Sequence, residues 1–187
     1  MKQYKGAASE RMDTRTLPAG GYVARILHAE VESFDWGEKL RIDFDICEGE
    51  YKGYFDQQFA ASNFDDKKWK GAIRLVVPNE GSQYFEGEKR RFNNFIWSIE
   101  HSNKGYTWGW DESTLTGKMI GVIFGNKEWE YKGKTGWAAV CTGLCSVDDI
   151  RMGNYKVPAD KPLKKPAGTA GSGAEAFASV SEDELPF

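Results

Sequence analysis

Hydrophobic and charged residues alternate with a period of two over residues 40–46, where Leu, Ile or Phe occupies every second position. This alternation is typical of an antiparallel strand with one face in a core and the other in solvent. Residues 22–32 carry a similar pattern with one irregularity, which predicts a strand with a β-bulge. The segment between them, residues 33–37, is short and ends in glycine, so we expect a hairpin loop between the two strands.

A third apolar run, residues 54–59, follows the turn at Gly49 and predicts a third strand. Residues 63–70 predict a short helix. Asn63 can cap its first turn, because an asparagine side chain accepts hydrogen bonds from the backbone N–H groups there. The negative charges of Asp65 and Asp66 would interact favourably with the positive N-terminal end of the helix dipole.

The period then changes to that of a helix. One apolar face repeats at i, i+3, i+4 and i+7 and consists of Phe92, Phe95, Ile96 and Ile99. The helix ends before residues 103–105, which close with glycine. Lys89, Arg90 and Arg91 near its beginning have the pattern of a solvated helix face.

Two further strands are predicted at residues 118–124 and 136–144, joined by residues 125–135 as a long hairpin tip or an extended ribbon. Residues 146–150 close the body, as one helical turn. The order is therefore three strands, a helix and two strands. A five-stranded barrel with one helix between strands three and four is the oligonucleotide/oligosaccharide-binding (OB) fold. We expect a mainly β protein with this barrel and a disordered C-terminal tail.

The 187 residues suit one domain with appendages. We expect a flexible arm over residues 1–16 and an OB-fold single-stranded nucleic-acid-binding domain over residues 17–157. Residues 158–180 are rich in Pro, Lys, Ala, Gly and Ser, and predict a flexible linker with an r.m.s. reach of about 25 Å. Residues 181–187 are acidic, and we expect them to form a partner-binding tip.

Net charge is −3, and from residue 158 onward three lysines face five acids, so the body is nearly neutral. Nucleic-acid binding depends on neutralising phosphates, and any such site must therefore be a local patch. The odd number of cysteines in apolar surroundings predicts buried free thiols in a reducing compartment. The chain carries no apolar run of bilayer length and no secretory h-region at its start, so we expect a cytoplasmic protein without membrane contact.

Signals of catalysis and of bound cofactors are weak. His28 and His101 do not lie beside a nucleophile in a known motif, and the chain has no glycine-rich phosphate loop. Two histidines without a close cysteine pair give little support to a zinc site. We expect a protein without enzymatic activity, metal or cofactor.

In an OB fold, ligands bind on the face of strands two and three and at the loops that join strands one to two and four to five. Both predicted loops carry tryptophan beside lysine. Nucleobases stack on exposed aromatic rings with about 1–3 kcal/mol each, while lysine and arginine follow the phosphates. A packing role for each single loop tryptophan remains open. The expected DNA-binding residues are Trp36, Lys39, Arg41, Tyr51, Tyr54, Lys67, Trp69, Lys70, Lys127, Trp129, Tyr131, Lys132, Lys134 and Trp137.

The carboxylates of the acidic tip could contact a basic rim on a partner protein, and its phenyl ring could enter a pocket there. A tail that only aids solubility is the alternative. The tip resembles the acidic, Pro-Phe-ending tail of bacterial and phage single-stranded DNA-binding proteins. That resemblance implies recruitment of replication, recombination and repair proteins through Asp183, Glu184, Leu185, Pro186 and Phe187.

The second half of the body is similar to a family of prophage-encoded proteins regarded as single-stranded DNA-binding proteins. The similarity lies in the order of Trp69, Glu100-His101-Ser102-Asn103, Gly105-Tyr106-Thr107-Trp108, Gly117-Lys118, Ser146-Val147-Asp148 and Val157-Pro158. It implies a non-catalytic phage or prophage protein that coats single-stranded DNA in a bacterial host cell. The body is unlike that of the housekeeping bacterial protein, so neither its contact residues nor its tetramer are carried over, and a homo-oligomer is left open. An adaptor without DNA binding and an OB module for RNA or a sugar are the alternatives.

Overall fold

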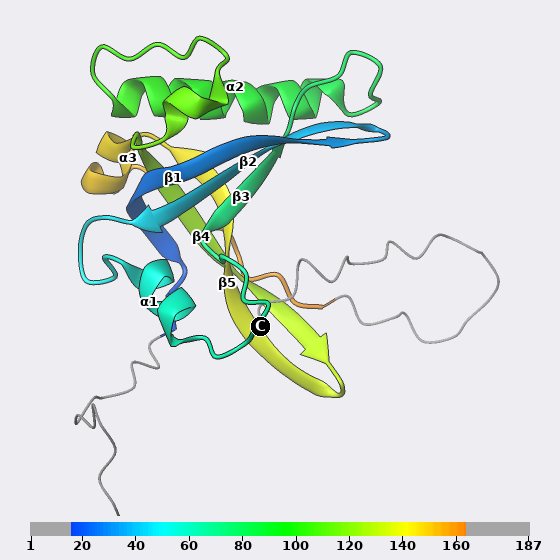
Figure 1. Ribbon diagram of the computed structural model, residues 1–187, viewed down its shortest axis with the longest axis vertical. Coiled ribbons are helices and arrows are strands. Elements are labelled where there is room, and N and C mark those ends of the chain that lie inside the picture. The colour runs from blue at the N-terminus through cyan, green and yellow to red at the C-terminus, as the bar shows by residue number, and fades with distance from the viewer. Residues whose placement is uncertain (1–15, 164–187) are drawn as a thin grey trace, which may run out of the picture.

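The computed structural model describes residues 16–163. The predicted arm, apart from residue 16, most of the predicted linker and the whole acidic tip lie outside this range. Within it, five antiparallel strands form one sheet in the order β3-β2-β1-β4-β5 (Figure 1). The strands are β1 (Gly20–Phe34), β2 (Gly37–Ile46), β3 (Ala72–Val76), β4 (Met119–Tyr131) and β5 (Lys134–Cys145). The helices are α1 (Tyr54–Ala61), α2 (Phe85–Ser102), the 3-10 turn η1 (Glu112–Leu115) and α3 (Val147–Met152).

The connectivity is that of a Greek key, because β4 returns over a long connection to pair with β1 on the side away from β2. The strands β3 and β5 end the sheet, and no ladder joins them within the described residues. The prediction of a mainly β protein with five strands is therefore confirmed, and the sheet is not closed by hydrogen bonds.

The alternation in β2 and the helical period in α2 are both confirmed. Leu40, Ile42 and Phe44 are buried on the inner face of β2. The face of α2 that contains Phe92, Phe95 and Ile99 packs onto the same core, and α2 crosses above the sheet in Figure 1. Burial of these two faces places one side of the sheet in the core and leaves the other for solvent or ligands.

The predicted third strand at residues 54–59 is wrong, because this segment forms α1. The N-cap residue of α1 is Gly53, which has no side chain to accept hydrogen bonds from the first backbone N–H groups of the helix. The buried carboxylate of Asp45 on β2 replaces it, accepting from the backbone N–H groups of Phe55 at 3.0 Å and Asp56 at 3.2 Å. A tertiary contact therefore overrides the local preference of this aromatic segment for a strand.

The predicted helix at residues 63–70 is also wrong, since these residues form a loop with one turn. The third strand is instead residues 72–76, in which Ile73 and Leu75 flank Arg74. This pattern has a period of two but only five residues, so it gives a weak strand signal.

The remaining strand predictions hold. β1 carries the expected irregularity between Ile26 and His28. The loop over residues 33–37 contracts to a two-residue turn at Asp35 and Trp36, since Phe34 already pairs with Gly37. Residues 125–135 form an extended ribbon that turns at Lys132 and Gly133, with φ values of 49° and 76°. Positive φ at both positions is the geometry of a type I′ hairpin.

Residues 158–163, at the beginning of the predicted linker, run along the edge of β4. The backbone N–H of Lys161 donates to the carbonyl of Asn126, and the N–H of Glu128 donates to the carbonyl of Lys161, both at 2.9 Å. This segment covers part of β4 beyond Phe124, where β4 no longer pairs with β1. The segment that leads to the tail therefore leaves the body beside the β4–β5 ribbon.

Candidate nucleic-acid interface

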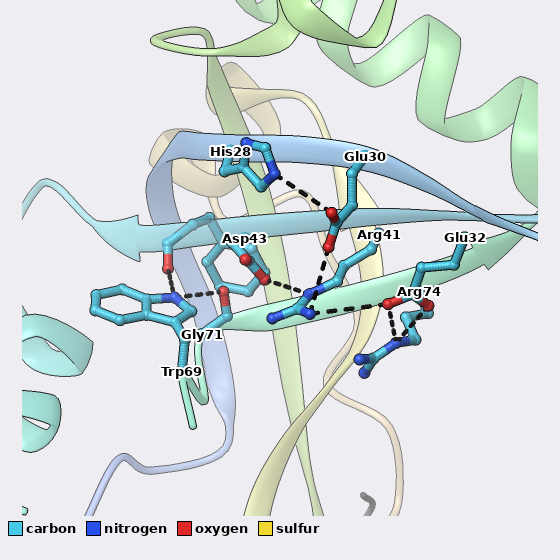
Figure 2. Close-up of polar contacts among 9 residues, drawn as sticks. His28, Glu30, Glu32, Arg41, Asp43, Trp69, Gly71 and Arg74 are labelled. Carbon is cyan, nitrogen blue, oxygen red and sulfur yellow. Dashed lines mark hydrogen bonds and ion pairs between the residues drawn. The ribbon is translucent and has the colours of Figure 1, made fainter. Parts of the chain in front are cut away.

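One face of the sheet carries polar and charged side chains along β1, β2 and β3 (Figure 2). Residues opposite one another in an antiparallel ladder share a face. Arg41 on β2 is opposite Glu30 on β1 and Arg74 on β3, and Lys39 is opposite Glu32. This outer face lies opposite the buried side chains of β2.

The two arginines in the middle of this face are paired with acids. Arg41 Nε lies 3.0 Å from Asp43 Oδ1, and its guanidinium also lies 3.4 Å from Glu30 Oε1. Arg74 Nε lies 3.0 Å from Glu32 Oε2. Partial burial opposes the charge of Arg41, but the hydrogen bond with Asp43 and the nearby acids outweigh it and raise the pKa of Arg41. Phosphates would therefore compete with carboxylates for both arginines.

At the tip of the β1–β2 hairpin, Phe34 and Trp36 stack on each other with ring centroids 5.3 Å apart and an interplanar angle of 11°. The ammonium group of Lys39 lies 5.2 Å from both ring centroids. Phe34 is 43% exposed and Trp36 is 55% exposed. Trp36 is therefore less buried than a lid over the end of a barrel would be, and the tip presents an aromatic surface beside a cation.

The β4–β5 ribbon separates the residues that the sequence grouped together. Lys127, Trp129, Tyr131 and Lys134 share one face of the ribbon. Trp137 lies on the other face, opposite Glu128. The Trp129 ring lies over Gly136, where an added Cβ would come within 2.7 Å of it. Lys132 at the turn places its ammonium group 5.1 Å from the centre of the Tyr131 ring.

A third strand at residues 54–59 that paired with β2 would have placed Tyr51 and Tyr54 beside Lys39 and Arg41, but this segment is α1 and they do not lie there. Tyr22, Tyr51 and Tyr54 form an edge-to-face row, with ring centroids 5.8 and 6.1 Å apart. The Tyr54 hydroxyl accepts a hydrogen bond from the backbone N–H of Leu17 at 3.1 Å. This row lies at the end of β2 that is about 23 Å from Lys39, at about 3.3 Å per residue.

Trp69 and its neighbours have mainly structural contacts. The Trp69 indole N–H donates to the carbonyls of Phe44 at 3.2 Å and Gly71 at 3.1 Å, and thereby fixes the start of β3 against β2 (Figure 2). Lys67 lies 4.6 Å above the Phe59 ring. Partial burial lowers the pKa of Lys70.

Sequence reasoning missed Arg74, because the third strand was expected elsewhere. A strand in which one arginine separates two aliphatic residues was the available signal. Phe34 lay in the predicted loop, but only the structure shows that it stacks on Trp36.

No model of a known protein family and no curated protein matches this chain. Within residues 16–163, no helix is both long and apolar enough to cross a membrane, and no group of three or more His, Cys, Asp or Glu could hold a metal ion. The interpretation of the site therefore depends on its own geometry.

Proposed function

We propose that this chain is a non-catalytic, OB-fold single-stranded DNA-binding protein of a phage or prophage, acting in the cytoplasm of the bacterial host. The Greek-key order and the position of α2 between β3 and β4 support the OB assignment, since that fold is a partly open five-stranded barrel of this kind. Ligands of OB folds bind on the outer face and at the two hairpins, where the charged and aromatic residues described above lie.

The stacked pair of Phe34 and Trp36 is the observation that carries the proposal. The two rings lie at a hairpin tip outside the core, and each covers one face of the other while both stay partly exposed to water. A nucleobase that stacks on Trp36 would cover the remaining face, and Lys39 would lie close to the neighbouring phosphate. Stacking of this kind is indifferent to base identity, as coating of DNA requires.

The ribbon supplies a second aromatic and basic surface. Lys127, Trp129 and Tyr131 follow one another on a single face, so a strand could alternate base and phosphate contacts along it. The neutral centre of the sheet contributes few free cations, because Arg41 and Arg74 are paired with acids. Most of the affinity is therefore expected at the two hairpins.

Tryptophan fluorescence during titration with a long oligo-dT, at low and at moderate salt, tests the proposal. We expect quenching that weakens steeply as salt rises, because phosphate contacts release counterions. The substitution W36F should remove a large part of the quenching. Absence of binding at low salt would eliminate the DNA-binding function and favour an adaptor. A parallel titration with oligo-rU separates DNA from RNA preference.

We further propose that Asp183, Glu184, Leu185, Pro186 and Phe187 recruit replication or recombination proteins, as their resemblance to the bacterial tail implies. These residues lie outside the described range. Deleting residues 181–187 should leave DNA affinity unchanged or raise it, because an acidic segment competes with phosphate. A large loss of affinity on this deletion would contradict the proposed division of labour.

A further inference from the structure

The two strands at the ends of the sheet, together with α2, line a cavity of about 290 Å³ that is open to solvent. The cavity is lined by side chains of β3, β5 and α2. Its apolar wall consists of Ile73, Leu75 and Leu144, and two arginines of α2, Arg90 and Arg91, line its opening. An apolar wall with a few charged groups is the usual composition of a small-ligand site.

Arg90 and Arg91 differ from the arginines of the outer face. Arg41 and Arg74 on that face, and Arg151 on α3, each form an ion pair with a carboxylate. Arg90 and Arg91 are exposed, and neither has an ion pair or hydrogen bond from its side chain to any residue between 16 and 163. A phosphate could therefore bind both guanidinium groups without displacing an acid of the body.

The strand β3 separates the cavity from the proposed DNA-binding face. Arg74 is opposite Arg41 and belongs to the outer face. Its neighbours in the strand, Ile73 and Leu75, point to the other side and line the cavity. A strand of DNA that passes Arg74 would therefore cross the edge of β3, which ends the sheet, to reach Arg90 and Arg91.

The β5 side of the cavity offers an extended peptide one backbone acceptor fewer. A peptide that adds to a sheet edge needs free backbone groups on that edge. The Asn94 side chain already donates from Nδ2 to the carbonyl of Leu144 at 2.8 Å, on the β5 edge that lines the cavity.

We propose that this cavity binds one nucleotide of the single-stranded DNA, with the phosphate held by Arg90 and Arg91 and the base against Ile73, Leu75 and Leu144. The proposal rests on the DNA-binding function proposed above and adds a contact site beyond the sheet face. Its volume lies at the lower end of small-ligand sites, so it suits one nucleotide and not several.

The test compares wild-type protein with the double variant Arg90→Ala and Arg91→Ala, using the anisotropy of a labelled oligo-dT of about 20 nucleotides, a length above typical site sizes for one OB fold. Both positions are exposed in a helix, where alanine is well tolerated. The matched control is K89A. It removes one charge from the same helix turn, but Lys89 lies over the Phe85 ring and does not line the cavity.

We expect the double variant to bind about tenfold more weakly at low salt, and its plot of log affinity against log salt to be shallower by about 0.7, for one lost phosphate contact on a single strand. K89A should remain within about twofold of wild type. A double variant with Lys at both positions should recover part of the affinity, because the charge is restored without the bidentate geometry.

An oligonucleotide of about five nucleotides, long enough for the sheet face alone, should bind both proteins equally. Unchanged affinity and salt slope for the long oligonucleotide would overturn the inference while leaving the DNA-binding function intact. The inference would also be overturned if the double variant kept its DNA affinity but lost binding of an acidic peptide. If wild-type protein binds neither oligonucleotide, the proposed function fails, and this inference fails with it.

Discussion

Glu32 on β1 holds two arginines of the neighbouring strands, since its carboxylate lies 3.0 Å from Arg74 Nε and 3.8 Å from the Arg41 guanidinium. One acid therefore neutralises much of the positive charge on the face proposed to carry DNA. The side chain of Glu32 is 22% exposed, so the pairs are only partly screened by solvent. Removal of this acid is therefore expected to strengthen DNA binding.

The substitution Glu32→Gln should raise the affinity for single-stranded DNA by about threefold to tenfold, because Arg74 becomes available to a phosphate while Arg41 stays paired with Asp43 and Glu30. The plot of log affinity against log salt should become steeper. Stability should fall by about 1 kcal/mol or less, as expected for ion pairs near the surface. Anisotropy with labelled oligo-dT measures the affinity, and D148N provides a charge-matched control on α3. Unchanged or weaker binding by E32Q would contradict the prediction that Arg74, once released from Glu32, binds a phosphate.

Truncation of the aromatic tip should weaken DNA binding without unfolding the protein. Trp36→Ala removes one stacking surface and should cost about 1–3 kcal/mol of binding free energy, or about 5-fold to 150-fold in affinity. The free energy of unfolding should change by about 0.5 kcal/mol or less, because Trp36 is more than half exposed.

The control for this variant is Trp97→Ala. Trp97 is also exposed, at 47%, and stacks on His101 at 4.1 Å, but it belongs to α2 and to neither hairpin. Equal losses of affinity in W36A and W97A would mean that tryptophan exposure, and not the position at the tip, explains the effect.

Trp69 was expected to contact DNA, whereas its hydrogen bonds indicate a role in the fold. Trp69→Phe keeps an aromatic ring but leaves the carbonyls of Phe44 and Gly71 without the indole donor. We expect a loss of about 1–2 kcal/mol in the free energy of unfolding, measured with urea, and little change in DNA affinity. A large loss of affinity with unchanged stability would restore Trp69 to the DNA-binding site.

The three cysteines are free, and each is partly buried. Burial raises the pKa of the Cys141 thiol to about 12 and that of Cys145 to about 11, from an ordinary value of 9.0. Labelling of these thiols in the native protein at pH 8 should therefore be slow, because the thiolate is the reactive form.

The same shifts predict a loss of stability in alkali. The native state holds the thiol protons more tightly than the unfolded chain, so this contribution is fully present below about pH 9 and is lost as pH rises towards about 12. Urea unfolding at pH 8 and pH 10.5 measures the loss. A C141A/C145A variant should show a smaller difference between the two values, and an equal difference would contradict this assignment.

Local patterns were sufficient for much of the fold. The alternation around Phe44 and the helical period through Phe95 each arise because one face of an element is buried, and that burial is visible in a single segment. The hairpin around Trp36 was also predicted from a single segment, because its turn residues identify it before any tertiary contact forms.

The remaining features depend on residues that meet only in the folded chain. The helix α1 begins where Asp45, ten residues earlier than Phe55, accepts the first N–H groups, and no pattern within the segment records that contact. The charge on the sheet face was equally hidden. Lys39 and Arg41 suggested a basic strand, but the register of β1 against β2 brings Glu30 and Glu32 alongside them. Sequence by itself determined which faces of β2 and α2 are buried, whereas tertiary structure decided which cations remain available to a ligand, because Coulomb pairing depends on distance in space and not along the chain.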